Sequence, residues 1–196
     1  VLAYDGTRPR LDDDGQPATR WDGVTMIRSH VTGDQIPDPD ARVALLDYLK
    51  PRPATWPDAE FIVGNPPFIG QYTKTAEQTA DMKAVWGADY DGYLDYVTGW
   101  HAQAMHYFAN QPVGRFAFVT TNSIAQGQPV PALFGPLHRE GWSIPFAHRT
   151  FAWSSEAPGA ASVYCTIVGF ARESSKPRLF TYDSVKSDPV DRKSTR

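Results

Sequence analysis

The chain has 196 residues, of which 41% are hydrophobic and 21% charged, as is usual for a globular domain that buries a core. Its formal net charge is −3, so the sequence lacks the basic balance of a nucleic-acid-binding protein, and any DNA contact is expected to be local or to lie on a part of the protein outside this chain. No apolar run reaches the ~18 residues of a membrane span, and the first residues lack the order of a signal peptide. The single cysteine, Cys165, lies in an apolar run and is expected in the core. We therefore expect a cytoplasmic protein with no membrane partner.

Three regions of the chain differ in composition. Residues 1–57 are rich in turn-forming residues and are predicted to be an irregular leading segment or linker. Within them, Asp40–Leu49 is predicted to form a short helix. Residues 58–182 carry the regular patterns of a folded domain, and residues 183–196 are predicted to be a flexible tail.

Strand-like and helix-like patterns alternate from residue 58 to residue 182. Phe61–Val63 is an apolar run that ends at Gly64, and it is predicted to be a short buried strand. The stretch from Leu94 to Phe108 is the clearest helix, because its apolar residues recur at helical spacing. The other predicted elements are, in chain order, a helix over 75–86 that Gly87 stops, a strand over 116–120, a helix over 131–139 that Gly141 ends, a strand around 144–151, a loop over 154–159, and strands over 162–170 and 178–182.

This order of elements predicts an α/β sheet with an antiparallel hairpin at one edge, formed by the strands on either side of the 154–159 loop. A ligand in such a sheet is expected at the carboxyl ends of the strands. Gly64–Phe68 and Thr121–Gln126 both follow predicted strands, so we expect them at the same edge.

The strand over 61–63 is left through an unusually stiff corner, Gly64-Asn-Pro-Pro-Phe. The two prolines, Pro66 and Pro67, fix φ and restrict the residue before each, so the backbone carbonyls point in defined directions. Asn65 offers a side-chain carbonyl acceptor and an amide donor, and Phe68 offers a flat apolar face. The corner therefore forms a cradle with two carbonyl acceptors, the Asn65 side chain and the Pro66 main chain, beside a stacking surface.

Such a cradle suits a planar ring that bears an exocyclic amine. The lone pair of an aromatic amine is delocalised into the ring, so the amine is a poor nucleophile. Two acceptors that hold its N–H groups draw the nitrogen toward a tetrahedral arrangement, and they act most strongly where water is excluded. If the attacked carbon belongs to a sulfonium with a good leaving group, orientation supplies much of the rest, and no strong base is needed.

A purely structural interpretation stands beside this one. In it the corner is a rigid turn, Asn65 caps backbone groups and Phe68 fills the core. The preceding strand, Gly64 and the α/β context favour a site.

The corner FIVGNPPFIG resembles the (N/D/S)-P-P-(Y/F/W) motif that ends the fourth strand of amino-directed DNA methyltransferases. The similarity extends from about Trp21 to about Phe180, and it favours the adenine-N6 methyltransferase domain of single-chain restriction–modification enzymes of types IIG and IIL. The resemblance implies a Rossmann-like class I sheet, of which 58–182 would be the downstream, catalytic part. The further segments that carry it are LDYVTGWHAQAMHYF, GRFAFVTTNSIAQGQPV and FAHRTFAWSSEAPGAASVYCTIVGF.

The resemblance also implies roles for single residues. Asn65 and the Pro66 carbonyl would hold the adenine amine, Pro67 would stiffen the corner, and Phe68 would stack on a base flipped out of double-stranded DNA. A second aromatic ring, on the loop between the last two strands, sandwiches the base in this family. Phe151 and Trp153 are the candidates, and Trp153 is preferred because it lies at the mouth of the loop. Core packing is the alternative for either ring.

Other polar residues carry weaker signals. Thr120–Ser123, with Asn122 at its centre, is predicted either to shape the floor of the pocket or to form a helix N-cap and turn. His148 and Arg149 are candidates for phosphate contact, although exposed basic residues usually only solvate a surface. His101 and His106 are five residues apart and do not share a helix face, so no metal site is expected.

The cofactor implied by the resemblance is S-adenosylmethionine. The family holds it mainly through a glycine-rich loop after the first strand, and residues 1–60 contain no such strand–loop–helix pattern. The resemblance therefore places this chain after the cofactor half of the domain and before the target-recognition region. The remainder of a parent polypeptide is an expected partner.

Two alternatives to the adenine enzyme remain open. An NPP(Y/F) corner also occurs in methyltransferases that act on rRNA guanine amines or on the glutamine amide of release factors, but the similarity in the later segments argues against them. In the second alternative, the chain is a non-catalytic fragment that contributes only DNA or protein contacts.

Overall fold

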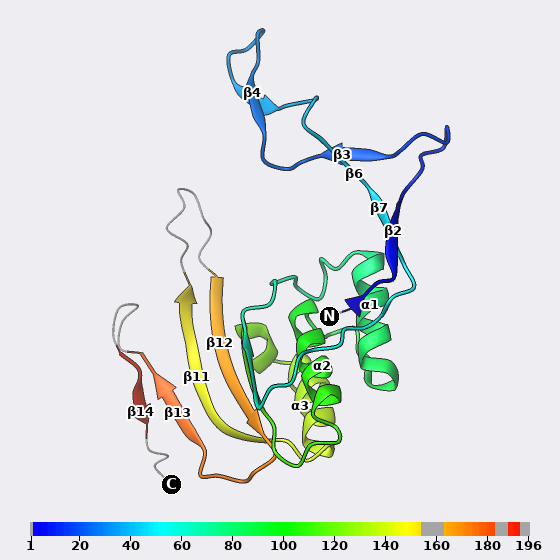
Figure 1. Ribbon diagram of the computed structural model, residues 1–196. Coiled ribbons are helices and arrows are strands. Elements are labelled where there is room, and N and C mark those ends of the chain that lie inside the picture. The colour runs from blue at the N-terminus through cyan, green and yellow to red at the C-terminus, as the bar shows by residue number, and fades with distance from the viewer. Residues whose placement is uncertain (1, 154–162, 183–187, 193–196) are drawn as a thin grey trace. The chain divides into compact units, whose positions relative to one another are not determined.

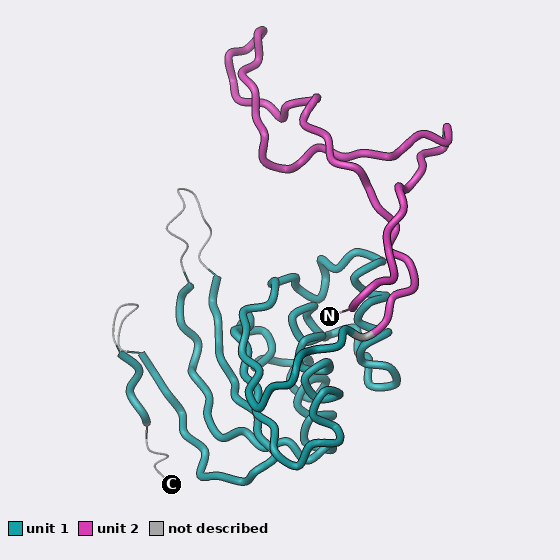
Figure 2. Tube along the Cα trace, viewed as in Figure 1, with its two compact units in different colours: residues 1, 53–196 teal, residues 2–52 magenta. Residues whose placement is uncertain are grey.

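The computed structural model describes residues 2–153, 163–182 and 188–192. It divides the chain into two compact units, residues 2–52 and residues 53–196 together with residue 1 (Figure 2). Each unit is described separately below.

The first unit is a succession of short antiparallel strand pairs. They are β2 (Gly6–Pro9) with β7 (Leu46–Leu49), β3 (Thr19–Trp21) with β6 (Arg42–Ala44), and β4 (Met26–Arg28) with β5 (Gln35–Pro37). Because the three pairs are nested along the sequence, the unit is one long, interrupted β-hairpin. The short strands β1 (Leu2–Ala3) and β8 (Arg52–Pro53) lie near its ends.

The helix predicted over Asp40–Leu49 is wrong, as is the prediction of an irregular leading segment. The stretch forms β6 and β7, and backbone bonds tie Leu45 to both Arg10 and Ala18 (Arg10 N to Leu45 O and Leu45 N to Ala18 O, each 2.8 Å). The ladder partners lie more than 20 residues away along the chain. A local helix pattern cannot report such pairing.

The second unit is built on a mixed six-stranded sheet with the order β14-β13-β11-β12-β10-β9. β9 and β10 run parallel, β10 and β11 each pair antiparallel with β12, and β13 pairs parallel with β11 and antiparallel with β14. The expected α/β class and the antiparallel pairing of β11 with β12 are confirmed. The predicted position of this pair at one edge of the sheet is wrong, because β13 and β14 continue the sheet beyond β11. The strands are β9 (Phe61–Gly64), β10 (Arg115–Thr121), β11 (Ser143–Trp153), β12 (Val163–Ala171), β13 (Arg178–Thr181) and β14 (Val190–Arg192).

Parts of two predictions fall on residues that are not described. The predicted loop over 154–159 lies outside the described residues, as does most of the predicted tail. Within that tail, Val190–Arg192 forms β14.

The helices pack on one face of the sheet (Figure 1). Phe116, Phe118 and Phe170 point to this face and are almost fully buried, as expected from the alternation of β10. His101, from α2 (Gly99–Tyr107), contacts all three rings edge-on, with ring centroids 5.1–6.0 Å apart. An aromatic layer therefore joins α2 to the centre of the sheet. Cys165 is also fully buried, as predicted.

Two helices end where glycine allows the chain to turn. α1 (Ala76–Trp86) begins with a capping box, in which Thr75 and Gln78 exchange side-chain and backbone hydrogen bonds of 2.9 and 3.2 Å, and ends at Gly87 (φ 58°). α3 (Pro129–Arg139) is followed by Gly141 with φ 81°. Both endings agree with the prediction. None of the helices in the described part of the chain is long and apolar enough to cross a membrane.

The structure corrects two details of the predicted core. The helix predicted from Leu94 begins only at Gly99 and is preceded by the 3₁₀ turn η2 (Tyr96–Thr98). The strand over 61–63 was expected to be buried, but Phe61 is 57% and Val63 78% exposed. The reason is that β9 is the edge strand and pairs only with β10 among the described strands.

Candidate functional site

The stiff corner and the Thr121–Gln126 loop lie at the same edge of the sheet, as expected. This edge is formed by the carboxyl ends of β9 and β10, and it is here called the carboxyl edge. β9 and β10 are parallel neighbours, with Gly64 opposite Phe118, so the segments that follow the two strands start at the same side of the sheet (Figure 1). The antiparallel strand β12 begins at this edge, since Cys165 lies opposite Thr121. Loops from three strands therefore converge here.

The four residues of the corner differ in exposure. Asn65 and Pro67 are exposed, Phe68 is half-buried and Pro66 is buried. No described residue makes a hydrogen bond with the Asn65 side chain. Its carbonyl and amide groups thus stay available at the sheet edge rather than capping the backbone.

A single carboxylate fastens the chain after the corner to the loop after β10. Asp95 is only 4% exposed, and its Oδ1 accepts a 2.7 Å hydrogen bond from the backbone N–H of Gln71. Its Oδ2 accepts hydrogen bonds from the hydroxyls of Thr121 (2.9 Å) and Ser123. Asp95 therefore fixes two loops that come from different strands.

Lys74 makes a second connection in the same region. Its ammonium donates to the backbone carbonyls of Gly92 (3.4 Å) and Leu94, and burial lowers its pKa while the nearby charge of Asp95 opposes the shift. The backbone N–H of Tyr96 donates to the Ile69 carbonyl at 2.9 Å. The chain from residue 69 to residue 74 is thus held against residues 92–96 at several points.

These attachments surround a cavity of about 470 Å³, here called the edge pocket. Asn122, predicted as a substrate-binding residue, is in its wall, together with Thr121 and Ser123. Thr120 is instead buried in the sheet and donates to the Thr166 carbonyl at 3.2 Å. The remaining wall residues are Gly70, Gln71, Tyr72, Thr73, Asp95, Val163 and Tyr164, so the pocket begins two residues beyond Phe68.

The two candidate aromatic rings of β11 have different surroundings. Phe151 is half-buried against Tyr182, with ring centroids 5.4 Å apart. Trp153 is 43% exposed at the end of β11 and pairs with Val163, a wall residue of the edge pocket. Trp153 is thus closer in register to the pocket, whereas Phe151 packs against Tyr182 and also against Trp153, with 6.2 Å between the Phe151 and Trp153 ring centroids.

The basic candidates at β11 have separate environments. The His148 ring stacks on Phe180 (centroids 4.8 Å apart), and its Nδ1 lies 2.8 Å from the Tyr182 hydroxyl, so it is engaged in packing. Burial lowers the pKa of His148. Arg149 is exposed. Among the described residues, no group of three or more His, Cys, Asp or Glu side chains is placed to hold a metal ion.

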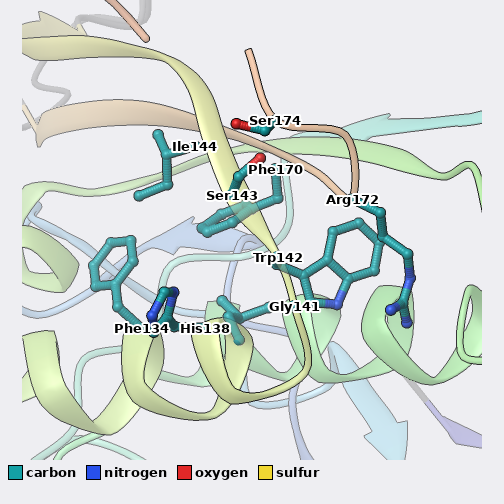
Figure 3. A pocket seen from close by; sticks show the side chains of 10 residues that line it. Phe134, His138, Gly141, Trp142, Ser143, Ile144, Phe170, Arg172 and Ser174 are labelled. Carbon is teal, nitrogen blue, oxygen red and sulfur yellow. The ribbon is translucent and has the colours of Figure 1, made fainter. Parts of the chain in front are cut away.

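Another cavity, of about 530 Å³, lies at the opposite end of the strands, and none of the predicted site residues is in its wall (Figure 3). Its walls include Phe134, Trp142, Phe170 and Arg172. The guanidinium of Arg172 lies 4.8 Å above the Trp142 ring and donates to the carbonyls of Glu140 (3.0 Å) and Phe108 (3.4 Å), at the ends of α3 and α2. This arrangement is typical of helix C-termini stabilised by a cation.

Sequence reasoning did not find Asp95, Lys74 or Gln71. Asp95 had a visible signal, since it is an acidic residue within the apolar run Leu94-Asp-Tyr-Val97, and a buried acid needs partners. Those partners lie 24 to 28 residues away along the chain, and only the fold brings them together.

Comparison with known proteins agrees with the resemblance. The sequence profile described as "MmeI, DNA-methyltransferase domain" matches residues 19–181. "DNA methyltransferase A" of Bacillus subtilis (strain 168) is 31% identical over 143 residues, which are 72% of this chain and 16% of that protein.

Solved structures give the same relationship. One structure, of the type IIL restriction–modification enzyme MmeI in complex with DNA, is 42% identical and superimposes with a TM-score of 0.62 over 67% of this chain and 18% of that one. A DrdV–DNA complex is 15% identical over 62% of this chain and 14% of that one, with a TM-score of 0.43. The chain thus spans less than a fifth of the relatives' length. The profile covers most of it, and the chain belongs to the family of the MmeI DNA-methyltransferase domain, a domain of restriction–modification enzymes.

Proposed function

We propose that this chain is the amine-binding part of an adenine-N6 DNA methyltransferase. In this proposal the substrate is an adenine flipped out of double-stranded DNA. The observation that carries it is the position of Asn65. This residue follows the carboxyl end of β9, its side chain makes no hydrogen bond with a described residue, and it lies near the loop that Asp95 holds in place.

Asn65 and Pro66 hold the amine in this proposal. The Asn65 side-chain oxygen and the Pro66 carbonyl each accept one N–H of the exocyclic amine and draw its lone pair out of the ring. Phe68 stacks on the base, and Trp153 closes the opposite side. The Rossmann-like arrangement that the resemblance implies belongs to the proposal as well.

S-adenosylmethionine would supply an electrophilic methyl group on a sulfonium. The described residues do not form a seat for it by themselves, because the chains after β9 and β10 are not glycine-rich strand–loop–helix turns. No role is therefore assigned to any residue of this chain in binding the cofactor.

The remainder of a longer polypeptide is the partner that we propose for β9. Its outer edge pairs with no other described strand, and the exposed side chains of Phe61 and Val63 lie beside that edge. Exposed apolar edge strands are usually covered by another strand or segment. The covering segment would contain the cofactor seat. We call this longer polypeptide the parent enzyme.

The same exposed edge favours the second candidate, a non-catalytic fragment that only docks on its partner. The two candidates differ in one property. Only the enzyme depends on the Asn65 side chain.

Asn65→Ala in the parent enzyme is the direct test. The variant loses one of the two amine acceptors, and we expect methyl transfer to adenine to fall by at least about 100-fold, as when one preorganised hydrogen-bonding group is removed. Incorporation of labelled methyl groups into DNA measures the rate. Asn110→Ala, at an exposed asparagine beyond α2, is the matched control and should keep full activity. Full activity of Asn65→Ala would leave only the docking role.

Trp153→Ala tests the proposed second ring. Because base stacking on an aromatic ring is worth about 1–3 kcal/mol, the variant should bind DNA about tenfold more weakly. Phe151→Ala is the comparison, and a larger loss of affinity in Phe151→Ala than in Trp153→Ala would reassign the ring. Fluorescence anisotropy of labelled duplex DNA gives both affinities.

A further inference from the structure

A second, smaller cavity adjoins the edge pocket. It measures about 330 Å³ and shares three wall residues, Gln71, Tyr72 and Ser123, with the edge pocket. The rest of its wall comes from Tyr93 and from the turn that leads into α3, namely Gln126, Gly127, Gln128 and Pro129. This second pocket is not used by the amine-binding role proposed above.

The wall of the second pocket combines exposed rings with neutral hydrogen-bonding groups. Tyr72 is 85% and Tyr93 43% exposed, so neither ring is a core residue. Three glutamine amides provide both donors and acceptors, and no wall residue carries a charge. Planar neutral ligands with polar edges suit such a wall, because rings stack on their faces and amides bond their edges.

Phosphate suits the second pocket poorly, although α3 begins there. Two of the first three residues of α3, Pro129 and Pro131, have no N–H to donate. The N–H of the residue between them, Val130, is bonded to the Gly127 carbonyl at 3.3 Å. The usual anion-binding groups of a helix N-terminus are therefore missing or committed.

Gln71 supplies an independent sign of a ligand. Its side-chain Oε1 is buried and has no hydrogen-bond partner, although its backbone N–H is fixed by Asp95 at 2.7 Å. A buried acceptor without a partner is costly, and in a native protein it calls for an explanation. Gln71 belongs to the wall of both pockets, and a ligand N–H that reaches this oxygen after a turn of the side chain would satisfy it.

We propose that the second pocket binds a nucleobase other than the target adenine. The inference rests on the proposed function for its claim that the ligand is DNA. The base stacks on Tyr72 or Tyr93 and presents an N–H to Gln71. Two bases could supply this chemistry, the neighbour of the target in its own strand and the partner that the flipped adenine leaves unpaired.

The inference is tested by a double-mutant cycle, in which each protein variant is combined with DNA that carries one abasic site. The parent enzyme is given a duplex that was selected for binding from a random pool, so the choice of DNA does not depend on methylation. Each nucleotide in turn is replaced by an abasic site, and affinities are measured by anisotropy for wild type, Tyr72→Ala and Phe68→Ala. Tyr72 is exposed, so its loss should not prevent folding. Tyr48→Ala, at an exposed tyrosine outside both pockets, is the matched control.

We expect Tyr72→Ala to weaken binding of intact DNA about tenfold, the size of one stacking contact. At one abasic position the loss should vanish, because the base is already missing. That position should differ from the position at which the effect of Phe68→Ala vanishes. If it lies in the strand of the target adenine, the second pocket binds the neighbouring base, and if it lies in the other strand, the pocket binds the unpaired partner. Gln71→Leu should couple to the same position as Tyr72→Ala, whereas Tyr48→Ala should couple to none.

Several results would overturn the inference. They are a Tyr72→Ala variant that couples to no position, coupling of Tyr72→Ala and Phe68→Ala to the same base, and failure to select any duplex. The two proposals fail separately. Coupling of Tyr72→Ala without adenine methylation removes the proposed function alone, and methylation without that coupling removes only the second pocket's role.

Discussion

Two charged residues of opposite sign, Asp95 and Arg172, each join two segments, at opposite ends of the strands of the main sheet. At the carboxyl edge Asp95 gathers one N–H and two hydroxyls from the loops after β9 and β10. At the other edge Arg172 gathers the terminal carbonyls of α2 and α3. The larger cavity lies beside Arg172, where the buried Nε of Arg172 and Nε1 of Trp142 lack hydrogen-bond partners, and Gln71 Oε1 lacks one on the side of Asp95. Neither cavity size nor the presence of unpartnered polar atoms therefore separates the two edges, whereas the predicted site residues Asn65 and Asn122 lie only on the side of Asp95.

Asp95→Ala should have the largest effect. It leaves the N–H of Gln71 and the hydroxyls of Thr121 and Ser123 without their acceptor. Loss of a buried, hydrogen-bonded charge costs about 4 kcal/mol of unfolding free energy, and methyl transfer by the parent enzyme should be lost with it. Urea unfolding and the methylation assay measure the two effects.

Asp58→Ala, at an exposed aspartate just before β9, is the control for Asp95→Ala and should change neither quantity. If Asp95→Ala retained its stability, Asp95 would not be what holds the carboxyl edge together.

Acid should destabilise the aromatic layer in which His101 packs against the sheet. Burial lowers the pKa of His101 to about 4 from 6.5, and the Val97 backbone offsets this only in part. The unfolded chain therefore binds a proton at His101 below pH 6.5, while the folded chain resists it. Stability should fall as the pH drops from about 6.5 toward 4, by on the order of 3 kcal/mol.

His101→Phe should remove this part of the pH dependence, because a ring remains but nothing titrates. Urea unfolding at pH 7, 6, 5 and 4.5 compares the two proteins, with His106→Phe as the control on the same helix. Equal slopes for wild type and His101→Phe would contradict the assignment.

Local signals predicted most of the second unit, and pairing over long distances explains what they missed. The endings of α1 and α3 were visible in Gly87 and Gly141, and the strand-like patterns over 116–120 and 162–170 indicated β10 and β12. The exposed Phe61 and Val63 were missed because an apolar run does not show how many neighbours a strand has.

Candidate site residues show the same limit. Asn65 was found because a strand followed by Asn-Pro-Pro-Phe is a local pattern. Asp95 was missed because its role depends on contacts with Gln71 and Thr121, which lie 24 and 26 residues away. The strands of residues 2–52 were missed for the same reason, since their partners are distant in sequence.

Arg172→Ala should have the smallest of these effects and the most selective one. The variant loses two hydrogen bonds to helix C-terminal carbonyls and the contact with Trp142. Because the side chain is partly exposed, we expect a loss of about 2 kcal/mol in unfolding free energy. Methyl transfer by the parent enzyme should be unchanged at temperatures where the variant is folded, since the carboxyl edge is intact. Arg149→Ala, at an exposed arginine, should leave stability unchanged. A fall in activity of Arg172→Ala without a fall in stability would show that the larger cavity takes part in the reaction, and it would reverse the functional ranking of the two edges.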